Sequence, residues 1–152
     1  PEDDVRGRIE RIKSRGAGGE KVGAIRTELQ DEMMDKASVF RTDDSLRTVL
    51  GTVEQLKESW EKVSIDDKGE VFNYDLTEAM ELGYLIDLAE SLVASALTRT
   101  ESRGAHFRDD HPLRDDANWL KHTLVSRGTD GKPVLSYKDV VMGDYIPMER
   151  KY

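Results

Sequence analysis

A regular spacing of apolar side chains over residues 46–63 constrains the fold of this 152-residue chain more than any other feature. Apolar residues recur there every three or four positions, which is the period of an α-helix with one buried face. The stripe consists of Leu46, Val49, Leu50, Val53, Leu56, Trp60 and Val63. Because an amphipathic helix is stable in water only when another element covers its stripe, the segment predicts a packed helical protein.

Two further segments have the same helical spacing. The first carries its apolar residues at Val22, Ile25, Leu29, Met33 and Ala37. The second extends to about residue 100 and carries Leu82, Leu85, Ile86, Ala89, Leu92, Val93 and Ala96. Thr42 or the aspartates after it are suited to cap the middle helix, and Asn73 or Asp75 the last helix. We therefore predict an all-α fold, a three-helix antiparallel bundle whose stripes cover one another.

The chain before the first long helix predicts a short helix and a linker. Apolar residues share one helical face over residues 5–12. The glycine-rich sequence GAGG at 16–19 is typical of a flexible break. We assign residues 1–19 to this N-terminal helix and linker, and residues 20–102 to the three-helix bundle.

Residues 103–152 predict a charged loop followed by an extended tail within the same domain. The apolar residues of 119–124 suit one or two helical turns, whereas the alternation of residues 133–137 favours a short strand. Pro147 excludes a regular helix or strand ladder around it. We expect an irregular C-terminal tail that contains at most short strands.

Composition limits the classes of function. The formal net charge of −8 disfavours nucleic acid and anionic membranes as direct partners. No apolar run approaches the ~20 residues that span a bilayer, so we expect no direct membrane insertion. Without cysteine, the chain holds no disulfide, thiolate zinc site or Cys-ligated iron–sulfur cluster. Because the sequence begins with proline rather than methionine, we expect it to be a piece of a longer protein.

The sequence ESRGAHFRDDHPLRDD at residues 101–116 packs three arginines, two histidines and five acids together. A metal site is disfavoured because the arginines repel a cation and the spacing matches no zinc or calcium motif. His106 or His111 beside the aspartates could act as an acid or base, but no nucleophile lies at a recognisable spacing. The glycines of 16–19 also lack the spacing of a phosphate-binding loop.

A docking surface is the interpretation that we favour for this charged stretch. Arginines form bidentate pairs with carboxylates and bind backbone carbonyls at interfaces. A loop so dense in charge is costly to bury without matched partners, which must lie within the loop or on a surface that it meets. We predict that Arg103, Arg108 and Arg114 pair across the surface, with Trp119 as its aromatic anchor.

The sequence ALTRTESRGAHFRDDHPLRDDANWLKHTL at residues 96–124 resembles the segment near the C-terminus of succinate dehydrogenase and fumarate reductase flavoprotein subunits. Residues 26–46, 72–97 and the terminal IPMERKY at 146–152 extend the likeness, which is greatest to the succinate dehydrogenase flavoprotein subunit. Most of the matching positions form our candidate domain-interface motif: Arg99, Glu101, Arg103, Gly104, His106, Arg108, Asp110, Arg114, Asp115, Asp116, Trp119 and His122. Ser102, Pro112 and Lys121 also match the family.

This resemblance implies a C-terminal helical domain with a spectrin-repeat-like bundle and a tail that runs back over the flavin-binding domain. It also implies a parent subunit that oxidises succinate to fumarate with FAD. Electrons then pass to an iron–sulfur subunit, and membrane anchor subunits carry the quinone site. The flavin-binding and substrate-binding residues of the family lie upstream. We therefore expect no FAD, metal or catalytic residue in this chain, and no activity from it alone.

The implied partners are the flavin-binding domain of the same chain and the iron–sulfur subunit, with the membrane anchor subunits as indirect partners. The implied location is cytoplasmic, peripheral on the inner face of a bacterial cell membrane, or on the matrix side in a mitochondrion. Three alternatives remain open: a fumarate reductase domain, an L-aspartate oxidase domain with a similar SRG-x-H element, and a free-standing helical interaction module. The RDDANWLKHT and PMERKY sequences favour the succinate dehydrogenase interpretation over the oxidase.

Overall fold

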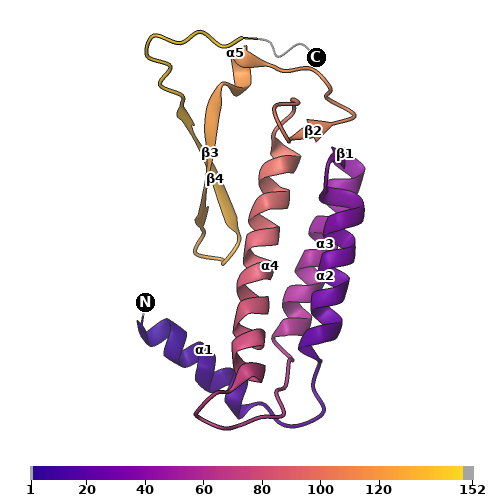
Figure 1. Cartoon of the computed structure of the whole chain (residues 1–152), viewed down its shortest axis with the longest axis vertical. Helices are drawn as coiled ribbons and strands as arrows, with labels where there is room; N and C mark the ends of the chain where they lie inside the picture. The colour runs from indigo at the N-terminus through magenta and orange to yellow at the C-terminus, as the bar shows by residue number, and fades with distance from the viewer. Residues whose placement is uncertain (1, 149–152) are drawn as a thin grey trace.

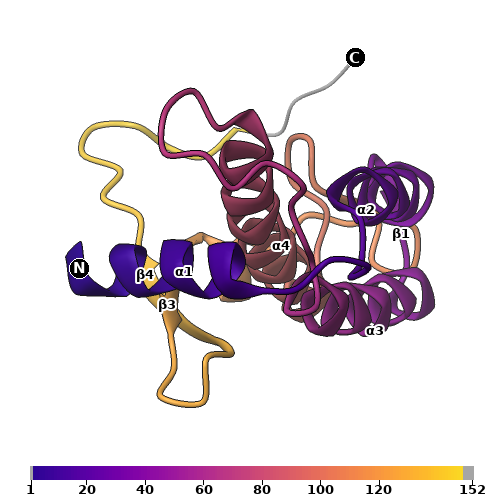
Figure 2. The same ribbon diagram turned by 90° about the horizontal axis from the view of Figure 1, so that it is seen from below.

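The computed structural model describes residues 2–148 and is built around three long helices that lie side by side (Figure 1). Helix α2 spans Val22–Ala37, α3 spans Asp43–Trp60 and α4 spans Tyr74–Thr98. Helix α3 runs opposite to α2 and α4, as the connections in Figure 1 show. A shorter helix, α1 (Glu2–Ser14), packs against the lower end of α4 (Figure 2). The protein is therefore mainly helical, as the apolar periodicity predicts.

Side-chain caps fix where α3 and α4 begin. Thr42 Oγ1 accepts a hydrogen bond from Ser45 N at 3.1 Å, and Ser45 Oγ accepts one from Thr42 N at 3.0 Å. This reciprocal pair is a capping box. Asn73 Oδ1 accepts a hydrogen bond from Leu76 N at 2.8 Å. The predicted cap at Thr42 is confirmed, and Asn73 rather than Asp75 caps α4.

The core lies between the three long helices and follows the predicted stripes closely. Its buried apolar residues are Ile12, Ile25, Leu29, Ala37, Leu46, Val49, Val53, Leu56, Trp60, Val63, Ile65, Ala79, Leu82, Ile86, Ala89, Val93 and Ala96. Leu85 and Leu92 are exposed, so placing them on the buried stripe of α4 was wrong. Helix α4 has apolar residues on more than one side, and spacing alone does not tell which side meets the neighbouring helices.

The glycine-rich stretch is fixed at its last residue. A Cβ added to Gly19 would lie 2.3 Å from the carbonyl oxygen of Lys62, so only glycine permits this approach. Gly19 N donates to Ser64 Oγ at 3.0 Å. Glu20 N donates to Lys62 O, and Ser64 N donates to Glu20 O, both at 3.1 Å. The expectation of a flexible break is therefore wrong at Gly19.

A hairpin of two antiparallel strands follows a single-turn helix, α5 (Asp116–Trp119). Strand β3 spans Lys121–Arg127 and β4 spans Pro133–Asp139, and the hairpin lies beside α4 (Figure 1). The predicted strand at 133–137 is found within β4. The helical turns predicted at 119–124 are wrong beyond Trp119, because pairing with the following strand β4 overrides local spacing. The PMERKY ending lies largely outside the described residues.

Candidate functional site

Residues 99–122 fold over the end of the molecule where α2 and α4 end and α3 begins (Figure 1). Strand β2 (Phe107–Arg108) pairs in parallel with β1 (Phe40–Arg41), which lies between α2 and α3. The rings of Phe40 and Phe107 pack edge to face, with centroids 5.8 Å apart. The loop thereby reaches the ends of all three long helices.

Arg108 is 0% exposed and joins the end of α4 to the start of α3. Its Nη1 donates to Ala96 O and Leu97 O, both at 3.0 Å. These carbonyls belong to the last turn of α4 and have no partner within the helix. Arg108 Nε and Nη2 donate to the two carboxylate oxygens of Asp110, at 2.7 and 2.8 Å. Asp110 in turn accepts a hydrogen bond from Asp43 N at 2.8 Å, at the positive end of α3.

The Asp110 carboxylate is held in its charged form by this arrangement. Hydrogen bonds from the Arg108 guanidinium keep the pKa of Asp110 well below its usual range. The Asp43 amide at the start of α3 lowers the pKa of Asp110 further. The pair therefore joins a cation at the negative end of α4 to an anion at the positive end of α3.

Glu101 forms a second buried centre in the loop. Its carboxylate accepts hydrogen bonds from Arg99 Nη1 at 2.6 Å, Arg103 Nε at 2.8 Å and Arg103 Nη2 at 3.0 Å. It also accepts one from Asp115 N at 2.8 Å. Burial alone raises the pKa of a carboxyl group, but the hydrogen bonds from Arg103, Asp115 and Arg99 lower the pKa of Glu101 below its ordinary value. Two guanidinium groups and one amide thus match this buried charge.

Asp116 links this centre to the C-terminal tail. Arg103 Nη2 donates to Asp116 Oδ1 at 2.6 Å, and Arg114 Nε donates to the same oxygen at 2.8 Å. Hydrogen bonds from Arg114 and Arg103 hold the pKa of Asp116 well below its usual range. Arg114 Nη1 donates to Met148 O at 2.7 Å. The tail is therefore fixed to the loop through Arg114.

Trp119 packs against side chains of this chain. The Arg99 guanidinium and the Lys121 Nζ each lie 5.0 Å from its ring centroid, and the Tyr137 ring meets it edge to face at 5.7 Å. The indole Nε1 donates to Thr100 Oγ1 at 3.1 Å. Trp119 thus holds the hairpin against the loop, and its role as an anchor for another surface stays a prediction.

His106 ties the loop to the end of α2. Its Nδ1 lies 2.9 Å from Arg41 Nη1, and its Nε2 lies 3.3 Å from Arg99 O. Because a guanidinium only donates, Nδ1 is the acceptor and Nε2 carries the proton. Arg41 Nε also donates to Ala37 O, the last residue of α2, at 2.9 Å. Burial lowers the pKa of His106, and the positive charge of Arg41 lowers it further.

The remaining motif residues shape the backbone or lie apart from the network. Gly104 has a φ of 59°, which glycine adopts without strain, in the turn at 103–106. Asp115 caps α5 by accepting a hydrogen bond from Asn118 N at 3.0 Å. His122 is exposed on β3, and none of the network's hydrogen bonds involve its side chain.

The predicted motif is thus assembled in space, but its partners lie inside the chain. Arg108 and Glu101 are fully buried, so the prediction that Arg108 pairs with a neighbouring surface is wrong. The physical reason is that the unpaired carbonyls of α4 lie within reach of its guanidinium. Arg103 and Arg114 remain partly exposed, and their contact with another domain stays a prediction.

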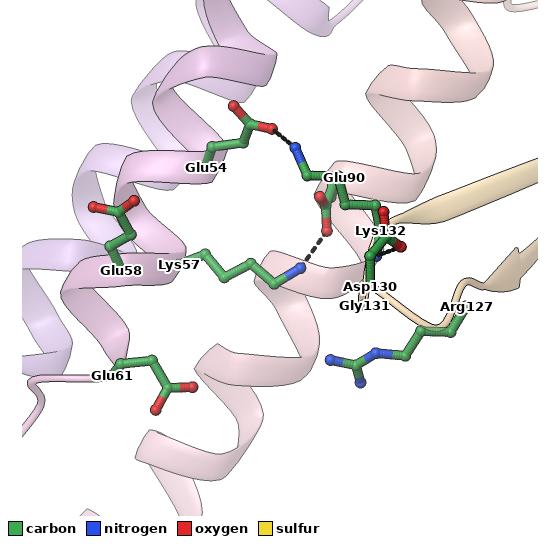
Figure 3. A pocket seen from close by; sticks show the side chains of 9 residues that line it. All are labelled: Glu54, Lys57, Glu58, Glu61, Glu90, Arg127, Asp130, Gly131 and Lys132. Atoms are coloured by element: carbon green, nitrogen blue, oxygen red, sulfur yellow. Dashed lines mark hydrogen bonds and ion pairs between the residues drawn. The ribbon is translucent and has the colours of Figure 1, made fainter.

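A cleft of about 440 Å³ lies between α3, α4 and the hairpin turn (Figure 3). Four of its charged side chains form two pairs: Lys57 with the buried Glu90, and Lys132 Nζ with Glu54 at 2.8 Å. Lys57 and Glu90 lie on different helices, and no sequence motif singles them out. Within residues 2–148, no cluster of three or more His, Asp or Glu side chains is arranged to hold a metal ion. In the same range, no helix is long and apolar enough to cross a bilayer.

Comparison with known proteins identifies the family. The family described as fumarate reductase flavoprotein C-term matches residues 26–152. The chain belongs to this family. The fumarate reductase flavoprotein subunit of Mycobacterium tuberculosis is 40% identical over 146 residues, which cover 95% of this chain and 25% of that protein. The succinate dehydrogenase flavoprotein subunit of Rickettsia conorii is 44% identical over 121 residues, or 80% of this chain and 20% of that protein.

The fold is also found in a solved member of the family. The FrdA chain of E. coli quinol fumarate reductase superposes with a TM-score of 0.90 at 35% identity, over 97% of this chain and 26% of that chain. The resemblance carried by residues 96–124 is therefore confirmed. This chain spans a fifth to a quarter of the length of these relatives.

Proposed function

We propose that this chain is the C-terminal helical domain of a succinate dehydrogenase flavoprotein subunit and that its role there is architectural. The observation that carries this proposal is the network of Arg108, Asp110 and Glu101, which ties together the ends of the helices. A buried network with its hydrogen bonds satisfied is rigid and costly to rearrange. It holds the surrounding surface in one shape, as a docking domain requires. We also propose that α2, α3 and α4 form a spectrin-repeat-like bundle.

The parent subunit would oxidise succinate to fumarate with FAD bound by its upstream region. Electrons would pass to an iron–sulfur subunit and then to quinone, with membrane anchor subunits holding the assembly at the inner face of the membrane. The residues of this chain do not fit FAD. Five acids line the cleft of Figure 3 against three bases, and two of these bases, Lys57 and Lys132, are already paired with Glu90 and Glu54, so the excess of negative charge repels a diphosphate. This chain would therefore support the flavin site from outside rather than form it.

The outward side of residues 99–122 is the surface that we assign to the flavin-binding domain. Arg103 and Arg114 are partly exposed, and their guanidinium groups are held in place, Arg103 by Glu101 and Asp116 and Arg114 by Asp116 and Met148 O. Fixed in this way, each guanidinium meets a neighbour with little loss of side-chain entropy. Leu113, which precedes Arg114 in the sequence, is also exposed.

Separate expression of the two parts of the parent subunit tests this function. The 152-residue chain should show neither flavin absorbance nor succinate-dependent dye reduction. The flavin-binding part should bind flavin less tightly and lose more than tenfold of its activity when this chain is deleted. Flavin bound by this chain alone, or full activity of the parent without it, would contradict the proposal.

A further inference from the structure

The connection between α3 and α4 exposes three large apolar side chains close together in sequence. Val71 is 74% exposed, Phe72 84% and Tyr74 73%. We call these three residues the Phe72 patch. The connection lies at the opposite end of the long helices from residues 99–122 (Figure 1). Exposed apolar residues gathered in this way are typical of a surface that another protein covers.

The backbone at Phe72 is strained. Its φ is 56°, and no other non-glycine residue within residues 2–148 has a positive φ. A bulky residue rarely adopts this conformation, which glycine adopts freely. Asn73 holds the loop in place, because its Nδ2 donates to Asp67 O at 2.9 Å and to Gly69 O at 3.0 Å. The loop therefore carries strain while it presents an aromatic ring to solvent, which is the pattern expected at a functional contact.

The sequence around the patch is acidic, and one of its acids, Asp66, is paired with Lys21 Nζ at 3.1 Å. Between residues 66 and 78 the chain has one base, Lys68, and five acids: Asp66, Asp67, Glu70, Asp75 and Glu78. Two of the acids are fixed by the loop, since Asp75 Oδ2 accepts from Asp67 N at 3.0 Å and Asp67 Oδ1 accepts from Gly69 N at 2.7 Å. The Nζ of Lys68 donates to Arg15 O at 3.0 Å. A complementary surface is an apolar socket with a rim of lysine and arginine.

The size of the patch indicates where that socket lies. A fully buried aromatic side chain contributes roughly 150–250 Å², so three residues cover a few hundred Å². A stable interface between separate proteins needs about 800 Å² from each partner. A smaller contact is sufficient between parts of one polypeptide, because covalent linkage raises the effective concentration to roughly millimolar. The relatives of this chain have three quarters or more of their length outside the matched region.

We propose that Val71, Phe72 and Tyr74 insert into a socket rimmed by lysine and arginine on the remaining part of the same flavoprotein subunit. This rests on the proposed function and adds a second contact, at the end of the helices opposite residues 99–122. Phe72 is the anchor, and the acids around it set the orientation. The docked domain is then held at both ends of its long helices, which prevents it from pivoting about one loop.

Hydrogen–deuterium exchange tests the proposal in the 152-residue chain and in the full parent subunit. The amides of residues 70–74 should exchange at least tenfold more slowly in the parent subunit. Glu70→Lys should abolish this protection, because it places a cation against the basic rim. Glu58→Lys is the matched control, since it makes the same charge change on α3, in the cleft of Figure 3. The control variant should keep the protection.

A second variant separates docking from folding. Phe72→Gly relieves the positive φ and removes the ring, so the 152-residue chain should melt within about 2 °C of the wild type. The same change should remove the protection of residues 70–74 in the parent subunit. A large loss of melting temperature in the isolated chain would show that Phe72 holds the loop itself, and would overturn the proposal.

The pattern of exchange distinguishes the possible failures. Protection of residues 99–122 without protection of residues 70–74 overturns the socket but leaves the proposed function standing. If no part of the chain is protected in the parent subunit, the proposed function fails as well. Protection that appears only when an iron–sulfur subunit is added, or only at high concentration of the 152-residue chain, places the partner outside the same polypeptide and overturns the proposal.

Discussion

The two ends of the long helices differ in how their side chains are paired. At one end, residues 99–122 bring many charges together, and the structure satisfies them with this chain's own carboxylates, carbonyls and amides. At the other end, the α3–α4 connection is held by a smaller set of hydrogen bonds around Asn73 and Asp67, and the chain there exposes Val71, Phe72 and Tyr74. The density of charge in residues 99–122 therefore marks first of all a network within this chain, whereas the strained and exposed apolar residues of the α3–α4 connection are the surface that we propose for a second contact.

The difference follows from the helix termini at each end. Helices α2 and α4 both present unpaired carbonyls near residues 99–122, and arginine has donors to spare for them after pairing with a carboxylate. At the opposite end, α4 begins with Asn73, which supplies its own cap. Helix α3 ends there, and one arginine serves the carbonyls at and just after its end, because Arg15 Nη1 donates to Trp60 O at 2.9 Å and to Val63 O at 3.2 Å. The α3–α4 connection is consequently free to present side chains outward.

The largest expected effect on stability comes from removing the hydrogen bonds of Arg108. Arg108→Met keeps much of the volume but leaves the α4 carbonyls without their donor and Asp110 with only the Asp43 amide. Removing one partner of a buried ion pair costs about 3–5 kcal/mol, and we expect a loss of that size in the free energy of unfolding. Urea unfolding of the 152-residue chain measures it. Arg47→Met, which breaks an exposed pair with Asp43 on α3, is the control and should leave the stability unchanged.

Close packing helps to fix the end of the helices near α1. A Cβ at Gly83 would lie 2.7 Å from the Trp60 ring, whose Nε1 donates to Ala79 O at 2.7 Å. We expect Gly83→Ala to cost about 1–3 kcal/mol through overpacking. Gly51→Ala is the matched control, because nothing lies within 4 Å of its added Cβ in the middle of α3. It should stabilise the chain by about 0.5–1 kcal/mol in the same denaturation experiment, the opposite sign.

A smaller effect on stability is expected from pH, through His106 in residues 99–122. The folded protein lowers the pKa of His106 from its ordinary value of 6.5, so the unfolded chain takes up the proton first as pH falls. Stability is therefore full above about pH 6.5 and is lost as pH falls toward the lowered pKa. Melting temperatures measured from pH 7.5 to 5.5 should decline, and His106→Asn should flatten the decline. His122→Asn, at an exposed position, should leave it intact.

Sequence patterns predicted the helices and the cap at Thr42 because these depend on neighbours within a few residues. Residues 96–124 also identified the family, since the motif is long and specific. Only one strand of the hairpin, β4, was predicted, because β3 is fixed by its pairing with β4 rather than by its own spacing. The direction in which Arg108 points was predicted wrongly for a similar reason. Its carbonyl partners on α4 are common to every helix end and leave no mark in the sequence.

The stability of the isolated chain after Glu101→Gln tests most directly whether the charges of residues 99–122 are paired within this chain and stabilise it. The change removes the charge that pairs with Arg99 and Arg103 while keeping the size of the side chain. We predict a loss of about 3–5 kcal/mol in the free energy of unfolding of the 152-residue chain in the absence of any partner. An unchanged stability in the isolated chain, together with weakened assembly of the parent subunit, would contradict the account.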